Sequence, residues 1–130
     1  MRLLLDTNRY RDLCAGDPET LKTIQQADTI RIPFVVLAEL RSGFLCGTMA
    51  RKNEQYLTRF LNSNRVETLY ADESTTHHFA QVFAQLRLQG TPIPAKDIWI
   101  AALAIQHDLL LYSRDKHFDN LPQVAREDRS

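Results

Sequence analysis

The fold is decided by residues 94–115, which read PAKDIWIAALAIQHDLLLYSRD. From Asp97 to His107, apolar residues recur every three or four positions, which predicts a helix that is buried on most sides. Leu109–Tyr112 is a short apolar run typical of a buried parallel strand, and an acid, Asp115, follows soon after it. A helix, a tight turn and a strand in this order form half of a βαβ unit.

The beginning of the chain repeats the strand half of this pattern. Leu3–Leu5 is a second short apolar run, and it also stops at an acid, Asp6. Ligands of open parallel sheets bind beyond the carboxyl ends of the strands, near the point where the strand order reverses. If the two runs are neighbouring central strands, Asp6 and Asp115 meet at that edge. The helix that precedes the second strand starts at the same edge, which brings Asp97 there.

The rest of the chain extends the alternation of strands and helices. Strands are expected near residues 3, 30, 66 and 109, and the segments between them carry the apolar periodicity and the capping residues of helices. This order predicts an α/β fold with a parallel sheet. A chain of 130 residues fits one domain, so we expect a single domain over residues 1–130, with a polar and lightly attached tail from about residue 125.

Composition narrows the class of protein. Sixteen Lys and Arg balance sixteen Asp and Glu, so a nucleic-acid partner must be held by a local basic patch or through a metal. We expect a cytoplasmic protein without a membrane span, because no apolar run approaches the length of a span. Cys14 and Cys46 lack the spacing of a zinc or redox motif, and we expect reduced thiols that act as small apolar fillers.

Four acids are the candidates for chemistry. Asp6 and Asp115 follow strands, Asp97 opens a helix, and Glu39 lies within an apolar helical stripe. Charges about 4 Å apart repel by about 4 kcal/mol at an effective dielectric of 20, so a cluster of these acids needs protons or cations. Carboxylates without a paired histidine or thiolate suit Mg²⁺ or Mn²⁺, which can activate water and stabilise charge on a phosphodiester. His117 lies near a turn that could approach the acids, but we do not expect it to take part in catalysis.

Each acid also has a purely structural interpretation. Asp97 is favoured in a first helical turn by the free N–H groups there, and Asp6 and Asp115 are common turn residues after strands. Glu39 could simply belong to the flank of an amphipathic helix. Three polar neighbours of the acids also have two interpretations: Thr7, Asn8 and Ser113. Their side chains could form hydrogen bonds with the local backbone, or they could orient the acids.

Four motifs combine these residues: LLLDTN at 3–8, VVLAELRSG at 35–43, PAKDIWIAALA at 94–104 and SRDKHF at 113–118. In this order and spacing they resemble the motifs of PIN-domain ribonucleases, and most closely those of the VapC toxins of bacterial toxin–antitoxin pairs. The resemblance covers essentially the whole chain. It implies a PIN-like parallel sheet of four to five strands flanked by helices, in a three-layer α/β/α arrangement.

The resemblance also implies an activity, that of a Mg²⁺- or Mn²⁺-dependent endoribonuclease. In such enzymes metal-activated water attacks an RNA phosphodiester and leaves a 5′-phosphate and a 3′-hydroxyl. Asp6, Glu39, Asp97 and Asp115 occupy the family's acidic metal-binding and catalytic positions. Its polar supporting positions are matched by Thr7 or Asn8 and by Ser113. Candidate phosphate contacts, for which a solvated surface is an equally good interpretation, are Arg9, Arg11, Arg41, Lys96, Arg114 and Lys116.

Partners follow from the same resemblance. It implies an RNA substrate, a homodimer and a small antitoxin that lays a peptide across the acidic crevice, often with a basic side chain reaching the acids. Two rival classes stay open. A metal-dependent phosphatase or phosphotransferase would share the strand-end acids, but usually has a second acid beside the first, where Thr7 and Asn8 stand. A non-catalytic RNA- or protein-binding PIN-like module would keep the fold with a degenerate site.

Overall fold

A parallel sheet of four strands forms the centre of the computed structural model, which describes residues 1–127. The strands are short, and each follows a helical segment except the first. They are β1 (Arg2–Leu5), β2 (Thr29–Pro33), β3 (Val66–Leu69) and β4 (Leu110–Tyr112). Their order across the sheet is β3-β2-β1-β4, and all three pairings are parallel.

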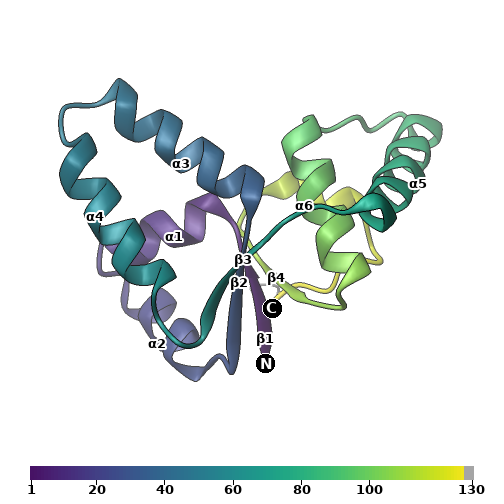
Figure 1. The fold of residues 1–130 in the computed structure, drawn as a ribbon. Coiled ribbons are helices and arrows are strands. Elements are labelled where there is room, and N and C mark those ends of the chain that lie inside the picture. Colours follow the sequence, from purple (N-terminus) through teal and green to yellow (C-terminus); the bar gives the residue numbers. More distant parts are fainter. Residues whose placement is uncertain (128–130) are drawn as a thin grey trace.

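Six α-helices cover the two faces of the sheet. They are α1 (Thr7–Cys14), α2 (Pro18–Gln26), α3 (Phe34–Cys46), α4 (Ala50–Leu61), α5 (Glu73–Gln89) and α6 (Ala95–Gln106), and a 3₁₀ turn, η1 (Lys116–Asn120), follows β4. Figure 1 shows α1 to α4 on one side of the sheet and α5 with α6 on the other. The predicted three-layer α/β/α fold is therefore confirmed. Within residues 1–127, no helix combines the length and the apolar character needed to cross a membrane.

The strand order reverses between β1 and β4. The chain moves outward from β1 to β2 and β3, and then returns through α5 and α6 to place β4 on the free side of β1. Leu5 pairs with Tyr112, and the N–H of Asp6 donates to the Tyr112 carbonyl at 3.1 Å. The prediction that these two strands are neighbours is confirmed. Because the strand order reverses between them, their carboxyl ends form the kind of crevice in which open sheets bind ligands.

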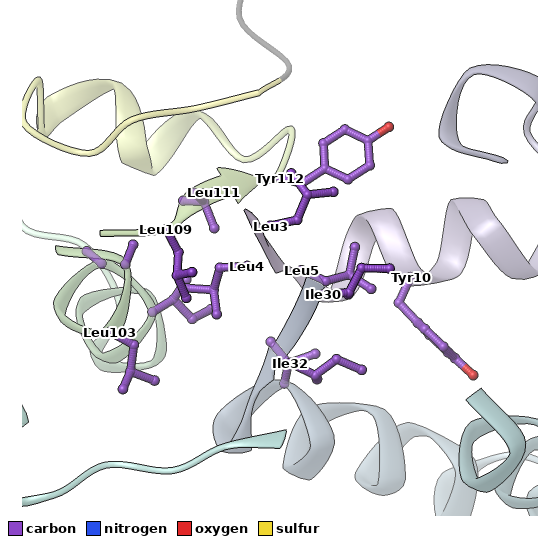
Figure 2. Packing of buried hydrophobic residues seen from close by; sticks show 14 of the residues in the cluster. Leu3, Leu4, Leu5, Tyr10, Ile30, Ile32, Leu103, Leu109, Leu111 and Tyr112 are labelled. Carbon is purple, nitrogen blue, oxygen red and sulfur yellow. The ribbon is translucent and has the colours of Figure 1, made fainter. Parts of the chain in front are cut away.

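The strands are continuous apolar runs in the sequence because both of their faces are buried. Leu3, Leu4 and Leu5 are completely buried, because helices cover both faces of the sheet. Figure 2 shows Leu103 of α6 on one side of the strands and Tyr10 of α1 on the other. Every residue of α6 from Ile100 to Ala104 is buried as well, as the sequence predicts. The helix that carries Asp97 in its first turn is thus packed into the core.

The expectation of a lightly attached tail from residue 125 is wrong for residues 125–127. The N–H of Leu111 donates to the Ala125 carbonyl at 2.8 Å, and the N–H of Glu127 donates to the Leu111 carbonyl at 3.0 Å. These residues therefore run beside β4 as an additional short parallel segment. The remainder of the expected tail, residues 128–130, lies outside the described residues.

The two cysteines are free thiols, as predicted, but they are not core fillers. Cys14 and Cys46 are both exposed at the ends of α1 and α3. The expected burial is wrong because residue type alone does not set it: both cysteines lie in the last turn of a helix, beyond the buried stretch.

Candidate active site

Asp6 lies at the centre of the candidate site and is almost completely buried, with 1% of its surface exposed. It directly follows β1 and is the N-cap of α1, so its carboxylate accepts the N–H of Thr7 at 2.7 Å. The other carboxylate oxygen accepts the hydroxyl of Ser113 at 2.6 Å. A buried carboxylate is costly unless it is hydrogen-bonded, and these two donors supply that compensation.

Ser113 connects the two strand ends. Its hydroxyl donates to Asp6 and accepts the N–H of Asp115 at 3.1 Å. The amide nitrogen of Asn8 lies 3.3 Å from the same hydroxyl, and its amide oxygen accepts the N–H of Arg114 at 3.3 Å. Asn8 and Ser113 therefore hold the segment after β4 against the segment after β1, which is the geometry expected of residues that orient acids.

The ammonium group of Lys96 stands among three carboxylates that come from different parts of the chain. Lys96 lies in the first turn of α6, whereas Glu39 lies in α3 and Asp6 follows β1. The distances from the Lys96 Nζ are 3.9 Å to Asp6 Oδ1, 3.1 Å to Glu39 Oε2 and 3.6 Å to Asp97 Oδ1. Three of the four predicted acids thus surround one positive charge.

The fourth acid, Asp115, joins the cluster through His117. The Nδ1 of His117 lies 2.7 Å from Asp97 Oδ2 and 3.1 Å from Asp115 Oδ1. Asp97, Asp115 and His117 offer three possible ligand atoms within 4.8 Å of one another. The sequence argument set His117 aside. The sequence signal for His117 was its position near a turn, two residues after Asp115, and in the structure η1 brings it to Asp97.

Burial and charge act in opposite directions on the ionisation of this cluster. Burial raises the pKa of the Asp97 carboxyl, and the opposing effects of His117 and Lys96 do not reverse this. Burial also works to raise the pKa of Glu39, but the nearby Thr7 hydroxyl and Lys96 outweigh it, so this pKa is lowered. For Lys96 burial alone would lower the pKa, and the surrounding carboxylates raise it. The site thus favours a cation.

The donor set fits a divalent metal ion. Asp97 Oδ1 is buried and has no hydrogen-bond partner among the described residues, although Lys96 lies 3.6 Å away. An unsatisfied carboxylate oxygen beside Asp6 and Glu39 is an arrangement that a hard cation would satisfy, because Mg²⁺ and Mn²⁺ prefer oxygen ligands. The neighbouring Asp115 adds a further carboxylate that is only partly buried.

The six basic residues predicted as phosphate contacts fall into different environments. Arg41 forms a two-point ion pair with Glu54 at 3.0 and 3.1 Å, and Arg114 forms one with Asp12 at 2.8 and 2.7 Å. Arg9 also contacts Asp12, at 3.2 Å, and lies over the Tyr112 ring.

Arg11 and Lys116 are exposed, and Lys96 lies among the acids. Whether any of the six residues binds phosphate stays a prediction.

Comparison with known proteins identifies the family. The family model for the PIN domain matches residues 3–124. This chain belongs to the PIN-domain family. Ribonuclease VapC5 of Mycobacterium tuberculosis is 30% identical over 98 residues, which are 75% of this chain and 73% of that protein. The tRNA(fMet)-specific endonuclease VapC of Salmonella typhimurium is 27% identical over 131 residues, 98% of each chain.

The fold is also similar to that of solved structures over nearly the whole chain. The crystal structure of VapBC2 from Rickettsia felis, bound to a DNA fragment from its promoter, matches with a TM-score of 0.84 at 26% identity and covers 98% of each chain. Together with the relatives, this match places the protein in the VapC group of PIN-domain proteins, as the motifs had suggested.

Proposed function

We propose that this PIN-domain protein is a metal-dependent endoribonuclease and the toxin of a toxin–antitoxin pair. The observation that carries the proposal is the convergence of Asp6, Glu39 and Asp97 on one cationic group, within 3.9 Å of the Lys96 ammonium. Relatives over nearly the full length are named ribonucleases or RNA-specific endonucleases. The acids that the family motifs predict are therefore gathered in a form that could serve that chemistry.

The roles of the residues follow from their contacts. Asp6, Glu39, Asp97 and Asp115 would hold Mg²⁺ or Mn²⁺, and such a cation activates water for attack and stabilises negative charge on a phosphodiester. Ser113 keeps the Asp6 carboxylate oriented through its 2.6 Å hydrogen bond. Oriented ligands bind more tightly than mobile ones, so the surrounding hydrogen bonds are part of the proposed site.

Lys96 has two compatible roles in this proposal. Without a metal its ammonium compensates the charge of the three carboxylates. When a cation takes that position, the long side chain of Lys96 is free to turn toward a phosphate group at the mouth of the site, because 28% of the side chain is already exposed. The other proposed phosphate contacts are Arg9, Arg11, Arg41, Arg114 and Lys116.

A cognate antitoxin is the proposed protein partner, since similar chains are solved as VapBC complexes. A groove of about 710 Å³ between α1, α3 and α4 supports this proposal. Its lining includes the apolar residues Leu13, Phe44 and Phe60, and also Tyr56 and Met49, which are large and exposed. An apolar peptide segment of the antitoxin would bury these side chains. We also propose that the protein forms a homodimer.

The decisive experiment is cleavage of total cellular RNA by antitoxin-free protein in Mg²⁺, in Mn²⁺ and in EDTA, with mapping of new 5′ ends. Asp6→Asn removes one charge from the site, whereas the matched control Asp28→Asn changes an exposed aspartate that pairs with the N-terminus. We expect cuts at a few sites that require metal, persist in Asp28→Asn and disappear in Asp6→Asn.

Two outcomes would contradict the proposal in different ways. Release of phosphate from small monoesters with RNA left intact would favour a phosphatase or phosphotransferase. Identical RNA patterns for the wild-type protein and Asp6→Asn, with neither substrate consumed, would favour a non-catalytic binding module. Light scattering of the purified protein at several concentrations tests the homodimer separately.

A further inference from the structure

The side chain of Arg126 is buried against the loop that follows β4, which carries Ser113 and Asp115 of the site. Its side chain is 6% exposed, although it belongs to a polar chain end. Nη2 donates to the Ser113 carbonyl at 2.7 Å and to the Asp115 carbonyl at 3.1 Å. Nη1 forms an ion pair with Asp119 at 2.7 Å, and the guanidinium lies over the Phe118 ring. One side chain thus contacts four residues of the loop after β4 and of η1.

The backbone around Arg126 is held as firmly as its side chain. Leu111 in β4 accepts the N–H of Glu127 and donates its own N–H to Ala125, so the pairing encloses Arg126 on both sides. The strand β4 has only three residues and would otherwise be an edge strand held by β1 alone. Residues 125–127 therefore pair with the outer edge of β4 through Leu111, and this pairing fixes the point from which Arg126 reaches the loop.

We propose that Arg126 is a positioning residue of the active site. By holding the carbonyls of Ser113 and Asp115, its guanidinium fixes the path of the chain around both residues, and with it the direction of the Ser113 hydroxyl and the Asp115 carboxylate. The first of these orients Asp6, and the second lies beside His117. This inference rests on the proposed function, because the acids matter only if they hold a metal.

Arginine suits this role for a geometric reason. Its planar guanidinium presents several N–H groups in a rigid fork, so one side chain can bind two carbonyls and a carboxylate at once. A lysine has three donors on a flexible stem and can replace the charge without reproducing the plane. Outer partners of metal ligands typically contribute 10- to 100-fold to metal affinity or activity, so a displaced loop should weaken the site by about that factor.

The test compares the wild-type protein with Arg126→Met and Arg126→Lys. Arg65→Met is the matched control, because Arg65 also binds two main-chain carbonyls, those of Ile24 and Ala27, but on the far side of β2 from β1 and β4. Mn²⁺ affinity is measured by the electron paramagnetic resonance of free Mn²⁺, at a temperature where each variant is fully folded. Amide hydrogen exchange is followed at Asp115 and His117.

We expect Arg126→Met to weaken Mn²⁺ binding by about 10- to 100-fold, with Arg126→Lys recovering only part of the loss. The amides of Asp115 and His117, which bond Ser113 Oγ and Asp115 Oδ1, should lose protection. For RNA cleavage, kcat should fall while KM stays unchanged, because Arg126 is buried away from solvent. Arg65→Met should leave Mn²⁺ affinity within about twofold of the wild-type value, whatever its melting temperature.

Asp119→Asn separates the ion pair from the carbonyl contacts. It removes the charge that faces Nη1 and leaves both bonds of Nη2 in place. We expect it to keep most of the Mn²⁺ affinity, whereas a loss as large as that in Arg126→Met would assign the effect to the ion pair instead.

Failure of the proposed function and failure of the positioning role of Arg126 give different results. If the wild-type protein binds no Mn²⁺ and cuts no RNA, the proposed function is wrong, and the amide exchange still reports on the contacts of Arg126. If amide protection and Mn²⁺ affinity are the same in Arg126→Lys, Arg126→Met and the wild-type protein, the positioning role is overturned, whatever the activity of the protein.

Discussion

The helices α5 and α6 each carry an aspartate at their start, and these two aspartates have different contacts. Asp72 is the exposed N-cap of α5 and accepts the N–H of Thr75 at 3.0 Å and the Gln106 amide at 2.9 Å. Asp97 is the third residue of α6, is 1% exposed, and has one carboxylate oxygen without a hydrogen bond among the described residues. The N-cap position of α6 is Pro94, which makes no side-chain cap.

The difference appears in the ionisation of the two residues. The Gln106 amide and the Thr75 N–H hold the pKa of Asp72 below its usual range. Burial raises the pKa of Asp97. Hydrogen-bond donors stabilise the Asp72 carboxylate, whereas the buried Asp97 Oδ1 has no donor among the described residues. The comparison therefore favours a structural role for Asp72 and a functional role for Asp97, and three predictions can break or sharpen it.

The largest effect is expected from Asp97→Asn compared with Asp72→Asn. Removing a proposed ligand should lower metal-dependent RNA cleavage by at least about a hundredfold, since metal stabilisation of charge is worth several kcal/mol and each 1.36 kcal/mol is tenfold in rate. Asn caps a helix as well as Asp, so Asp72→Asn should cleave RNA at the wild-type rate. The measurement is the single-turnover cleavage rate at saturating Mn²⁺.

Stability is the second readout of this pair of variants. The metal-free melting temperature of Asp97→Asn should stay level or rise, because a neutral amide is less costly to bury than a carboxylate whose pKa is raised. A large drop in that temperature would identify Asp97 as a structural residue and would remove the contrast with Asp72.

An intermediate effect is expected from Lys96→Met, which removes the cation beside Asp97. The metal-free protein should lose about 1–3 kcal/mol of stability, because the carboxylates of Asp6 and Asp97 lose the nearby positive charge of the ammonium. Mn²⁺ should then bind about tenfold more tightly, since no ammonium competes for the site. Thermal melts with and without Mn²⁺ measure both changes.

The control for this prediction is Lys52→Met, an exposed lysine of α4. If Mn²⁺ raises the melting temperature by the same amount in Lys96→Met, Lys52→Met and the wild-type protein, Lys96 does not occupy the position of a metal ion.

The smallest effect is expected from Asp72→Ala, which removes the cap of α5. The melting temperature should fall by about 5 °C, as is typical for the loss of an N-cap, and the Mn²⁺ affinity should not change. The effect should depend on pH. Because the pKa of Asp72 is lowered on folding, its stabilisation is present above the unfolded pKa of about 3.9 and is lost as the pH falls through the folded value.

Melting curves of the wild-type protein and Asp72→Ala therefore should differ by a constant amount from pH 5 to 8 and converge below about pH 4. A gap that persists at low pH would mean that packing at the helix start, and not the charge of Asp72, supplies the stability.

Much of the fold and part of the candidate site could be predicted from local patterns. The apolar runs at Leu3–Leu5 and Leu109–Tyr112 identified two strands that are indeed neighbours. Gly90 ends α5 with a φ of 71°, which glycine reaches without strain. These features depend on residues within a few positions of one another, so periodicity and capping chemistry reveal them.

The features that sequence reasoning missed depend on how the elements pack together in three dimensions. His117 approaches Asp97 because η1 folds back on α6, and Arg126 reaches Ser113 because the chain end pairs with β4. The exposed state of Cys14 likewise depends on how far the last turn of α1 extends beyond the core. No local pattern encodes these separations.

The sequence by itself determined the strand and helix order and placed Asp6 and Asp97 next to a buried strand and a buried helix, because apolar periodicity and the affinity of acids for helix starts are local properties. Only the tertiary structure decided that Glu39 lies beside the same Lys96 ammonium as Asp6 and Asp97. It also decided that Asp97 is buried whereas Asp72 is exposed, and that Arg126 contacts the loop of Ser113 and Asp115. These depend on which side chains packing brings within about 4 Å, where charge interactions in a buried site become strong.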